Sequence, residues 1–142
     1  MSAKSEKVYK CRSIVKGAGS EKISGEAIIS QSAMCFYLCD PKTGTVIERN
    51  HPLQGRSIAG KILVLESGKG SSVVQVDGFY QLWTNGTLPK AIILRAAEPV
   101  IVSAAVVVGV RMVDGIEDIY DLIRDGDIVE VGEEEIRVVQ QS

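Results

Sequence analysis

The spacing of apolar residues predicts strands near both ends of the chain and in its middle. Short apolar runs bounded by glycine, proline or charged residues are typical of strands. They occur at residues 9–15, 25–30, 61–66, 91–94, 128–131 and 136–139, with briefer runs at 45–47 and 112–113. The last two long runs are separated by an acidic turn, which predicts a hairpin.

Apolar residues recur at spacings of three and four across residues 71–84, which predicts a helix with one apolar face. Gln75 falls outside that apolar face. Gly78 lowers helix propensity by about 1 kcal/mol relative to alanine, so we interpret it as a point where another backbone approaches closely. Asn85 and Gly86 supply the left-handed residue that commonly ends a helix.

Residues 99–108 are almost wholly apolar and carry conflicting signals. Pro99 favours a helix because proline is common at the first helical position, whereas the many valines favour a strand. We expect a helix. Its apolar perimeter requires burial on all sides, in the core or in a partner interface. A shorter helix is expected at residues 116–123.

Strands alternate with helices in the middle of the chain and lie at both of its ends, which predicts an α/β fold. We expect one domain over residues 8–142 and a disordered polar tail at residues 1–7. Residues 31–57 are the irregular part, with turn signals at 40–44 and 50–55. A loop of this length in a small domain is often functional.

The chain of 142 residues is long enough for one domain that buries roughly two-thirds of its unfolded surface. Its net charge is −2 and its basic residues form no stripe, which argues against nucleic-acid binding. Apolar runs fall short of the roughly 20 residues of a membrane span, and no signal peptide is recognised, so we expect a cytoplasmic protein with no membrane contact. The three cysteines, Cys11, Cys35 and Cys39, are an odd number and argue against a disulfide framework.

The richest chemical signal follows the third long strand, where a glycine turn leads into two serines and a helix. Main-chain N–H groups and the helix dipole converge on such a turn and favour an anion. The order Gly68, Lys69, Gly70, Ser71, Ser72 is not a Walker A motif, in which lysine follows the second glycine. A tight turn with a serine N-cap explains the local pattern equally well, so both interpretations stay open at this point.

The other candidates for chemistry carry weaker signals. His51 is the only histidine, and a single loop histidine is more often structural or exposed than catalytic. Cys35 and Cys39 could contribute to a metal or redox centre, but zinc and iron–sulfur sites usually need four protein ligands in tighter pairs. We favour two small, half-buried apolar residues here, expect Cys11 in the core, and predict no metal site within the chain.

A series of short segments gives the chain its most specific pattern. They are Asp-Pro-Lys-Thr-Gly at 40–44, Asn-His-Pro-Leu-Gln-Gly at 50–55, Gly-Lys at 60–61, Gly-Lys-Gly-Ser-Ser at 68–72, Tyr-Gln-Leu at 80–82, Asn-Gly-Thr-Leu-Pro-Lys-Ala at 85–91 and Gly-Asp at 126–127. Their order resembles the small subunit of aconitase X dehydratases, the counterpart of the swivelling domain of aconitase, over about residues 8–139. The chain departs from that family where Tyr37, Leu38 and Cys39 replace the frequent Gly-Gly-Val, so no metal role is assigned to Cys39. Residues 73–75 also differ from the commoner type, and substrate choice can differ accordingly.

The resemblance implies a single swivelling β/β/α domain and a large aconitase X subunit that carries an iron or iron–sulfur centre. It implies a hydro-lyase, active only as a heteromer, that dehydrates a small hydroxy acid of the cis-3-hydroxy-L-proline or phosphomevalonate class. The catalytic serine of the family corresponds to Ser71, which we expect to act as the general base. We expect Lys69, Gly70, Ser72 and His51 to contact the substrate.

Energetics limit what this chain can do alone. A helix N-terminus stabilises an anion by at most about 2 kcal/mol, and one pKa unit corresponds to about 1.36 kcal/mol. The dipole therefore lowers the pKa of a serine hydroxyl by one or two units, and the remaining stabilisation must come from cations or metal of the partner. The alternative function is a stand-alone binding module for a small carboxylate or phosphate, without catalysis. A redox role for Cys35 and Cys39 is a weaker third hypothesis.

Overall fold

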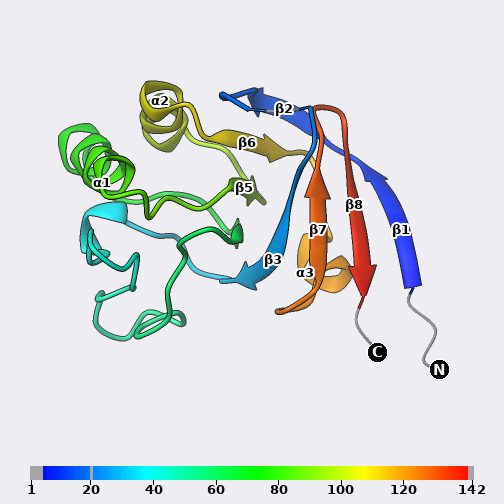
Figure 1. Ribbon diagram of the computed structural model, residues 1–142, viewed down its shortest axis with the longest axis horizontal. Helices are drawn as coiled ribbons and strands as arrows, with labels where there is room; N and C mark the ends of the chain where they lie inside the picture. The colour runs from blue at the N-terminus through cyan, green and yellow to red at the C-terminus, as the bar shows by residue number, and fades with distance from the viewer. Residues whose placement is uncertain (1–4, 20, 141–142) are drawn as a thin grey trace.

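A curved mixed sheet forms the frame of the protein, which is represented by a computed structural model that describes residues 5–19 and 21–140. Figure 1 shows two helices beside the parallel strands and a third behind the antiparallel strands. The strands are β1 (Ser5–Lys10), β2 (Arg12–Val15), β3 (Ile23–Ile29), β4 (Ile62–Leu65), β5 (Ala91–Leu94), β6 (Arg111–Asp114), β7 (Ile128–Val131) and β8 (Glu135–Gln140). The helices are α1 (Ser72–Thr84), α2 (Pro99–Val108) and α3 (Ile119–Leu122), and a 3₁₀ turn, η1 (Phe36–Leu38), precedes them.

The strand order is β1-β8-β7-β3-β4-β5-β6-β2. Strands β3 to β6 run parallel to one another, and every other pairing is antiparallel. The predicted α/β class and the hairpin of β7 and β8 are confirmed. The expected strand at 9–15 is divided between β1 and β2, which lie at opposite ends of the strand order. Because Cys11 alone separates them, the sheet curls until its two edges approach each other.

Two hydrophobic clusters lie on opposite faces of the parallel strands. In β4, Leu63 and Leu65 contribute to the cluster under α1 and α2, whereas Ile62 and Val64 contribute to the cluster that includes α3. All four residues of β4 are buried, as are all four of β5. A strand buried on both faces shows an unbroken apolar run rather than alternation, which explains why these segments were recognisable in the sequence.

The disordered tail expected at residues 1–7 is not found at residues 5–7. Residues 5–7 belong to β1 and pair with β8, while residues 1–4 lie outside the described residues. Cys11 was expected in the core, but it is only half-buried because it occupies the bend between β1 and β2. The brief strand expected at 45–47 is reduced to isolated bridges, Cys39 with Val46 and Thr45 with Ser57.

Helix α2 confirms the helical interpretation of the valine-rich segment. Its expected burial on all sides is not found within this chain, since Val106 is 60% and Val107 is 63% exposed. Ile101 and Ala105 face the core instead. Among the described residues, no helix combines the length and the apolar character that crossing a membrane requires.

Candidate functional site

The carboxyl ends of the parallel strands meet at one edge of the sheet, where the predicted glycine turn lies. The chain leaves β4 at Leu65, forms this turn and enters α1. The long loop that follows β3, residues 30–61, starts at the same edge because β3 and β4 are parallel. Met34 pairs with Gly68 in an isolated parallel bridge, which extends the β3–β4 neighbourhood past the ends of both strands. Ligands of open α/β sheets usually bind at this edge.

The N-terminus of α1 has the predicted cap. Ser71 has extended backbone angles (φ −71°, ψ 162°), and its Oγ accepts a long hydrogen bond from the Val74 N–H at 3.4 Å. Its carbonyl accepts the Gln75 N–H at 2.9 Å. The side chains of Ser71 and Ser72 are both exposed. The exposed Ser71 hydroxyl at this helix N-terminus is therefore open to a ligand and lies beside main-chain donors.

Glycine is required on both sides of Lys69. Gly70 has a φ of +108°, and a Cβ there would lie 3.2 Å from the Sγ of Cys35. A Cβ on Gly68 would lie 2.7 Å from the Cβ of Ile101 and 2.8 Å from a carboxylate oxygen of Glu98. Gly68 is thus enclosed by packing, whereas Gly70 combines a left-handed backbone with a close thiol.

Gln75 joins the long loop to α1, contrary to its expected position away from the apolar face. The side chain is fully buried. Its Oε1 accepts the Phe36 N–H at 2.8 Å, and its Nε2 donates to the Met34 carbonyl at 3.1 Å. One amide thereby satisfies two main-chain groups of a loop that would otherwise be buried without partners. The amphipathic pattern missed it because a polar residue in an otherwise apolar stretch is ordinarily assigned to solvent.

The close backbone approach expected at Gly78 is confirmed. A Cβ at this position would lie 2.3 Å from the Tyr37 nitrogen and 2.5 Å from the Phe36 carbonyl carbon. The rings of Phe36 and Phe79 lie 4.2 Å apart, which adds an aromatic contact to the same junction. The loop that follows β3 is therefore held tightly against α1, and the two form one wall of the site.

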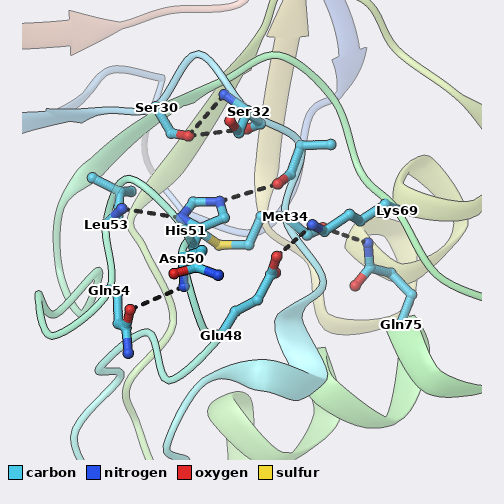
Figure 2. A network of polar contacts seen from close by, with 11 residues as sticks. Ser30, Ser32, Met34, Glu48, Asn50, His51, Leu53, Gln54, Lys69 and Gln75 are labelled. Atoms are coloured by element: carbon cyan, nitrogen blue, oxygen red, sulfur yellow. Dashed lines mark hydrogen bonds and ion pairs between the residues drawn. The ribbon is translucent and has the colours of Figure 1, made fainter.

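Lys69 is paired rather than free. Its Nζ donates to Oε2 of Glu48, which reaches the glycine turn from the long loop, as Figure 2 shows. The side chain of Glu48 is 15% exposed and that of Lys69 is 47% exposed. The other carboxylate oxygen of Glu48, Oε1, is buried without a hydrogen-bond partner among the described residues. Sequence reasoning did not identify Glu48, because a single glutamate in a loop carries no pattern.

His51 has both ring nitrogens occupied by main-chain groups. The Leu53 N–H donates to Nδ1 at 3.0 Å, so Nδ1 is the unprotonated nitrogen, and Nε2 donates to the Ala33 carbonyl at 3.0 Å. The residue is 6% exposed. Figure 2 shows it bridging the two arms of the long loop. The structure therefore places this candidate substrate contact inside the loop, with a structural role.

The three cysteines are free, and Cys35 approaches the glycine turn at Gly70. Cys35 and Cys39 are buried and free, and Cys11 is free as well. Burial, with smaller contributions from Cys35 and Glu48, raises the pKa of Cys39 to about 12. Burial likewise raises the pKa of Cys11 to about 11. A thiol that stays protonated is a poor nucleophile and a poor metal ligand, and no group of three or more suitable side chains in the described part of the chain could hold a metal.

A second polar cluster lies at the same edge of the sheet. Arg95 follows β5 and binds Glu66, which follows β4, with Nε at 2.5 Å from Oε1. This bond holds the pKa of Glu66 below its usual value. The Tyr120 hydroxyl lies 2.9 Å from the Ser30 carbonyl and 3.2 Å from Oε2 of Glu66. Sequence reasoning did not single out this cluster, although position immediately after a parallel strand was an available signal.

Comparisons with known proteins agree with this geometry. The aconitase X swivel domain family matches residues 8–139. The phosphomevalonate dehydratase small subunit of Methanothermobacter thermautotrophicus is 41% identical over 130 residues, which cover 90% of this chain and 95% of that one. The corresponding protein of Thermococcus onnurineus is 43% identical over 109 residues, 76% of this chain and 80% of that one.

A solved structure confirms the fold as well. The crystal structure of aconitase X from Thermococcus kodakaraensis in its holo-form superposes with a TM-score of 0.84 at 36% identity, covering 94% of this chain and 99% of the matched chain. The predicted resemblance and the swivelling-domain fold are thereby confirmed. The chain belongs to the aconitase X swivel domain family.

Proposed function

We propose that this chain is the small subunit of a dehydratase that acts on a small hydroxy acid together with a large subunit. Relatives that match most of its length are named as small subunits of phosphomevalonate dehydratase, which supports a substrate of that class. A cyclic hydroxy acid such as cis-3-hydroxy-L-proline is the second substrate candidate. Both candidates carry a carboxylate, which suits an anion site at the amino end of α1.

The position of Ser71 is the observation that carries the proposal. Its hydroxyl is exposed at the N-cap of α1, beside a glycine turn at the carboxyl end of a parallel strand. In the proposed reaction, the deprotonated Oγ removes the proton on the carbon next to the substrate carboxylate. A carbon–carbon double bond forms as the hydroxyl departs, so that the elements of water are lost, and Ser71 then releases its proton.

The surroundings of Ser71 account for part of its acidity. The Val74 N–H already points at Oγ, and this bond would shorten onto an oxyanion. The dipole of α1 supplies at most about 2 kcal/mol, one or two pKa units, toward the same oxyanion. We therefore propose that the large subunit provides the remaining positive charge and also holds the metal centre that the family resemblance implies. Among the described residues, no group of three or more His, Cys, Asp or Glu side chains could hold a metal ion.

The substrate carboxylate would bind next to Ser71. The main-chain N–H groups of Gly70 and Ser72, the Ser72 hydroxyl and the Lys69 ammonium are its proposed contacts. Anions at helix N-termini bind through this combination of amides and dipole. We assign no direct contact to His51, because both of its ring nitrogens form hydrogen bonds within the loop.

Replacement of Ser71 tests the proposal in the assembled complex. We expect Ser71→Ala, co-purified with the large subunit, to lower turnover of phosphomevalonate by about 10²–10⁴-fold, the range typical of losing a general base. Assembly should be unaffected because the side chain is exposed. Ser24→Ala, an exposed serine on β3, is the matched control and should retain full turnover. Steady-state kinetics and size-exclusion chromatography provide the two measurements.

Unchanged turnover in Ser71→Ala would remove this hydroxyl from the chemistry. Binding of the substrate without any turnover by the complex would instead favour the alternative function, a binding module for a small carboxylate or phosphate. Calorimetry with the isolated chain and with the complex separates these two results.

A further inference from the structure

Glu48 has a largely buried carboxylate whose two oxygens are treated differently by the fold. Its Oε2 accepts a hydrogen bond from the Lys69 ammonium, while its Oε1 is buried without a partner. No other buried side-chain nitrogen or oxygen in the described residues lacks a partner in this way. Leaving a carboxylate oxygen buried and unpaired is unfavourable, so such groups in native proteins call for a specific explanation.

Stability does not explain the Glu48–Lys69 pair. The carboxylate is largely buried, whereas the ammonium is about half exposed. Exposed ion pairs typically contribute little to stability, and the cost of desolvating a buried charge offsets much of its attraction to the partner. The long loop also has other anchors against α1, namely the amide of Gln75 and the contact at Gly78. The loop therefore does not depend on this ion pair to stay in place.

The geometry of Lys69 suggests what the pair does. Lys69 lies between two constrained glycines, two residues before Ser71, and its main-chain N–H donates to the Met34 carbonyl at 3.2 Å. Its side chain would be mobile in solvent without Glu48, since no other side-chain partner of its Nζ is found among the described residues. An ammonium has three N–H donors, and Glu48 uses only one of them.

We propose that Glu48 is a positioning residue that holds the Lys69 ammonium at the mouth of the Ser71 site, with its remaining donors available to the substrate anion. This inference rests on the proposed function, because it assigns a task to Lys69 within that site. Glu48 touches no reacting atom and acts through Lys69. Holding a long side chain in one orientation before the substrate arrives reduces the entropy lost on binding.

A double-mutant cycle in the assembled complex tests this role. The variants are Glu48→Gln, Lys69→Met and the combination, assayed by steady-state kinetics with phosphomevalonate. Each single variant should raise KM by about 10- to 100-fold, the equivalent of a hydrogen bond to a charged group, with a smaller change in kcat. The combined variant should be no worse than Lys69→Met alone, because Glu48 acts only through that ammonium. Glu26→Gln, which removes the exposed partner of Lys61, is the control and should leave KM unchanged.

Additive effects of the two substitutions on KM, or an unchanged KM in Glu48→Gln, would overturn the positioning role. If Glu48→Gln does not assemble, Glu48→Asp is tested in its place, once with Lys69 intact and once with Lys69→Met. Aspartate keeps the negative charge but is shorter by one methylene, which moves the carboxylate away from the ammonium. The result for Ser71→Ala is read separately. Full activity of Ser71→Ala counts against the proposed base, whereas a normal KM in Glu48→Gln counts against this inference alone.

Discussion

At the scale of single residues, several side chains have a role that differs from the one their residue type suggests, because the fold buries them. His51 is a candidate ligand by type, yet two main-chain bonds occupy its ring. Gln75 is a surface residue by pattern, yet it is fully buried and satisfies two groups of the long loop. The thiol of Cys39 is 3% exposed and stays neutral because burial disfavours its charged form.

We predict that alkaline pH destabilises the protein partly through Cys39. Its pKa is raised from 9.0 to about 12 in the folded state, so folding favours the neutral thiol. This contribution to the free energy of unfolding is complete below pH 9 and is lost as pH rises from about 9 toward 12, with a slope of at most about 1.36 kcal/mol per pH unit. Cys39→Ala should therefore show a shallower alkaline decline than the wild type in urea titrations at several pH values.

Cys11→Ala serves as the comparison for that experiment. Cys11 is only half-buried, so solvent screens its raised pKa and its removal should change the alkaline slope less. Identical slopes for Cys39→Ala and the wild type would show that the Cys39 thiol does not resist ionisation in the folded protein.

At the scale of elements, the junction between α1 and the long loop organises the site. The loop lies against α1 at Gly78 and Gln75 and carries Glu48 to the glycine turn. The glycine turn at residues 68–70 then sets the direction in which the chain enters α1 at Ser71. The position of the Ser71 hydroxyl therefore depends on how closely the backbone of the long loop approaches α1 at Gly78, several residues away.

Gly78→Ala should destabilise the protein even though alanine is the better helix former. The gain in helix propensity is about 1 kcal/mol, whereas a Cβ at this position would lie 2.3 Å from the Tyr37 nitrogen. Overpacking of this kind typically costs about 1–3 kcal/mol, and here the contacted atoms belong to the backbone. We expect a net loss of stability in chemical denaturation. Asp77→Ala, an exposed neighbour on the same helix, should stay within about 0.5 kcal/mol of the wild type.

Stabilisation by Gly78→Ala would mean that the loop can withdraw from α1 at little cost. In that case the variant should also show faster amide exchange in residues 34–38 than the wild type. Slower or equal exchange there, combined with lower stability, agrees with the tight junction described above.

At the scale of the whole molecule, helices α1 and α2 leave an apolar surface uncovered. A groove of about 480 Å³ lies between α1 and α2 and begins at Ser72, next to the proposed base. Its surroundings include Val73, which is 78% exposed, and Val107, which is 63% exposed. Contiguous exposed apolar surface of this kind is typical of protein–protein contacts. Because the groove continues from the Ser71 site, we expect the large subunit that completes this site to cover it.

Val107→Lys tests that expectation by placing a charge in the groove. We expect the isolated chain to keep its stability, since the side chain is already exposed, and the affinity for the large subunit to fall by tenfold or more because a charge would be desolvated. Val8→Lys, on the edge strand β1, is the matched control at 47% exposure. Titration of the large subunit with each variant gives the affinities, and equal affinities would exclude this surface from the interface.

The sequence by itself determined the elements that depend on near neighbours. Strands buried on both faces, the N-cap at Ser71, the close approach at Gly78 and the helix that starts at Pro99 were all recognisable locally, and the structure confirms them. Capping, turn chemistry and periodicity act over a few residues, so the pattern contains the information needed to place them.

Only the tertiary structure decided which distant residues share the site. Glu48 meets Lys69 across 21 positions and Gln75 meets Phe36 across 39, contacts that no local pattern encodes. The structure also decided that His51 is enclosed, that the chain crosses between the two edges of the sheet at Cys11, and that Val107 stays outside the core. These outcomes depend on packing between segments far apart in sequence, because burial is a property of the assembled fold rather than of any one segment.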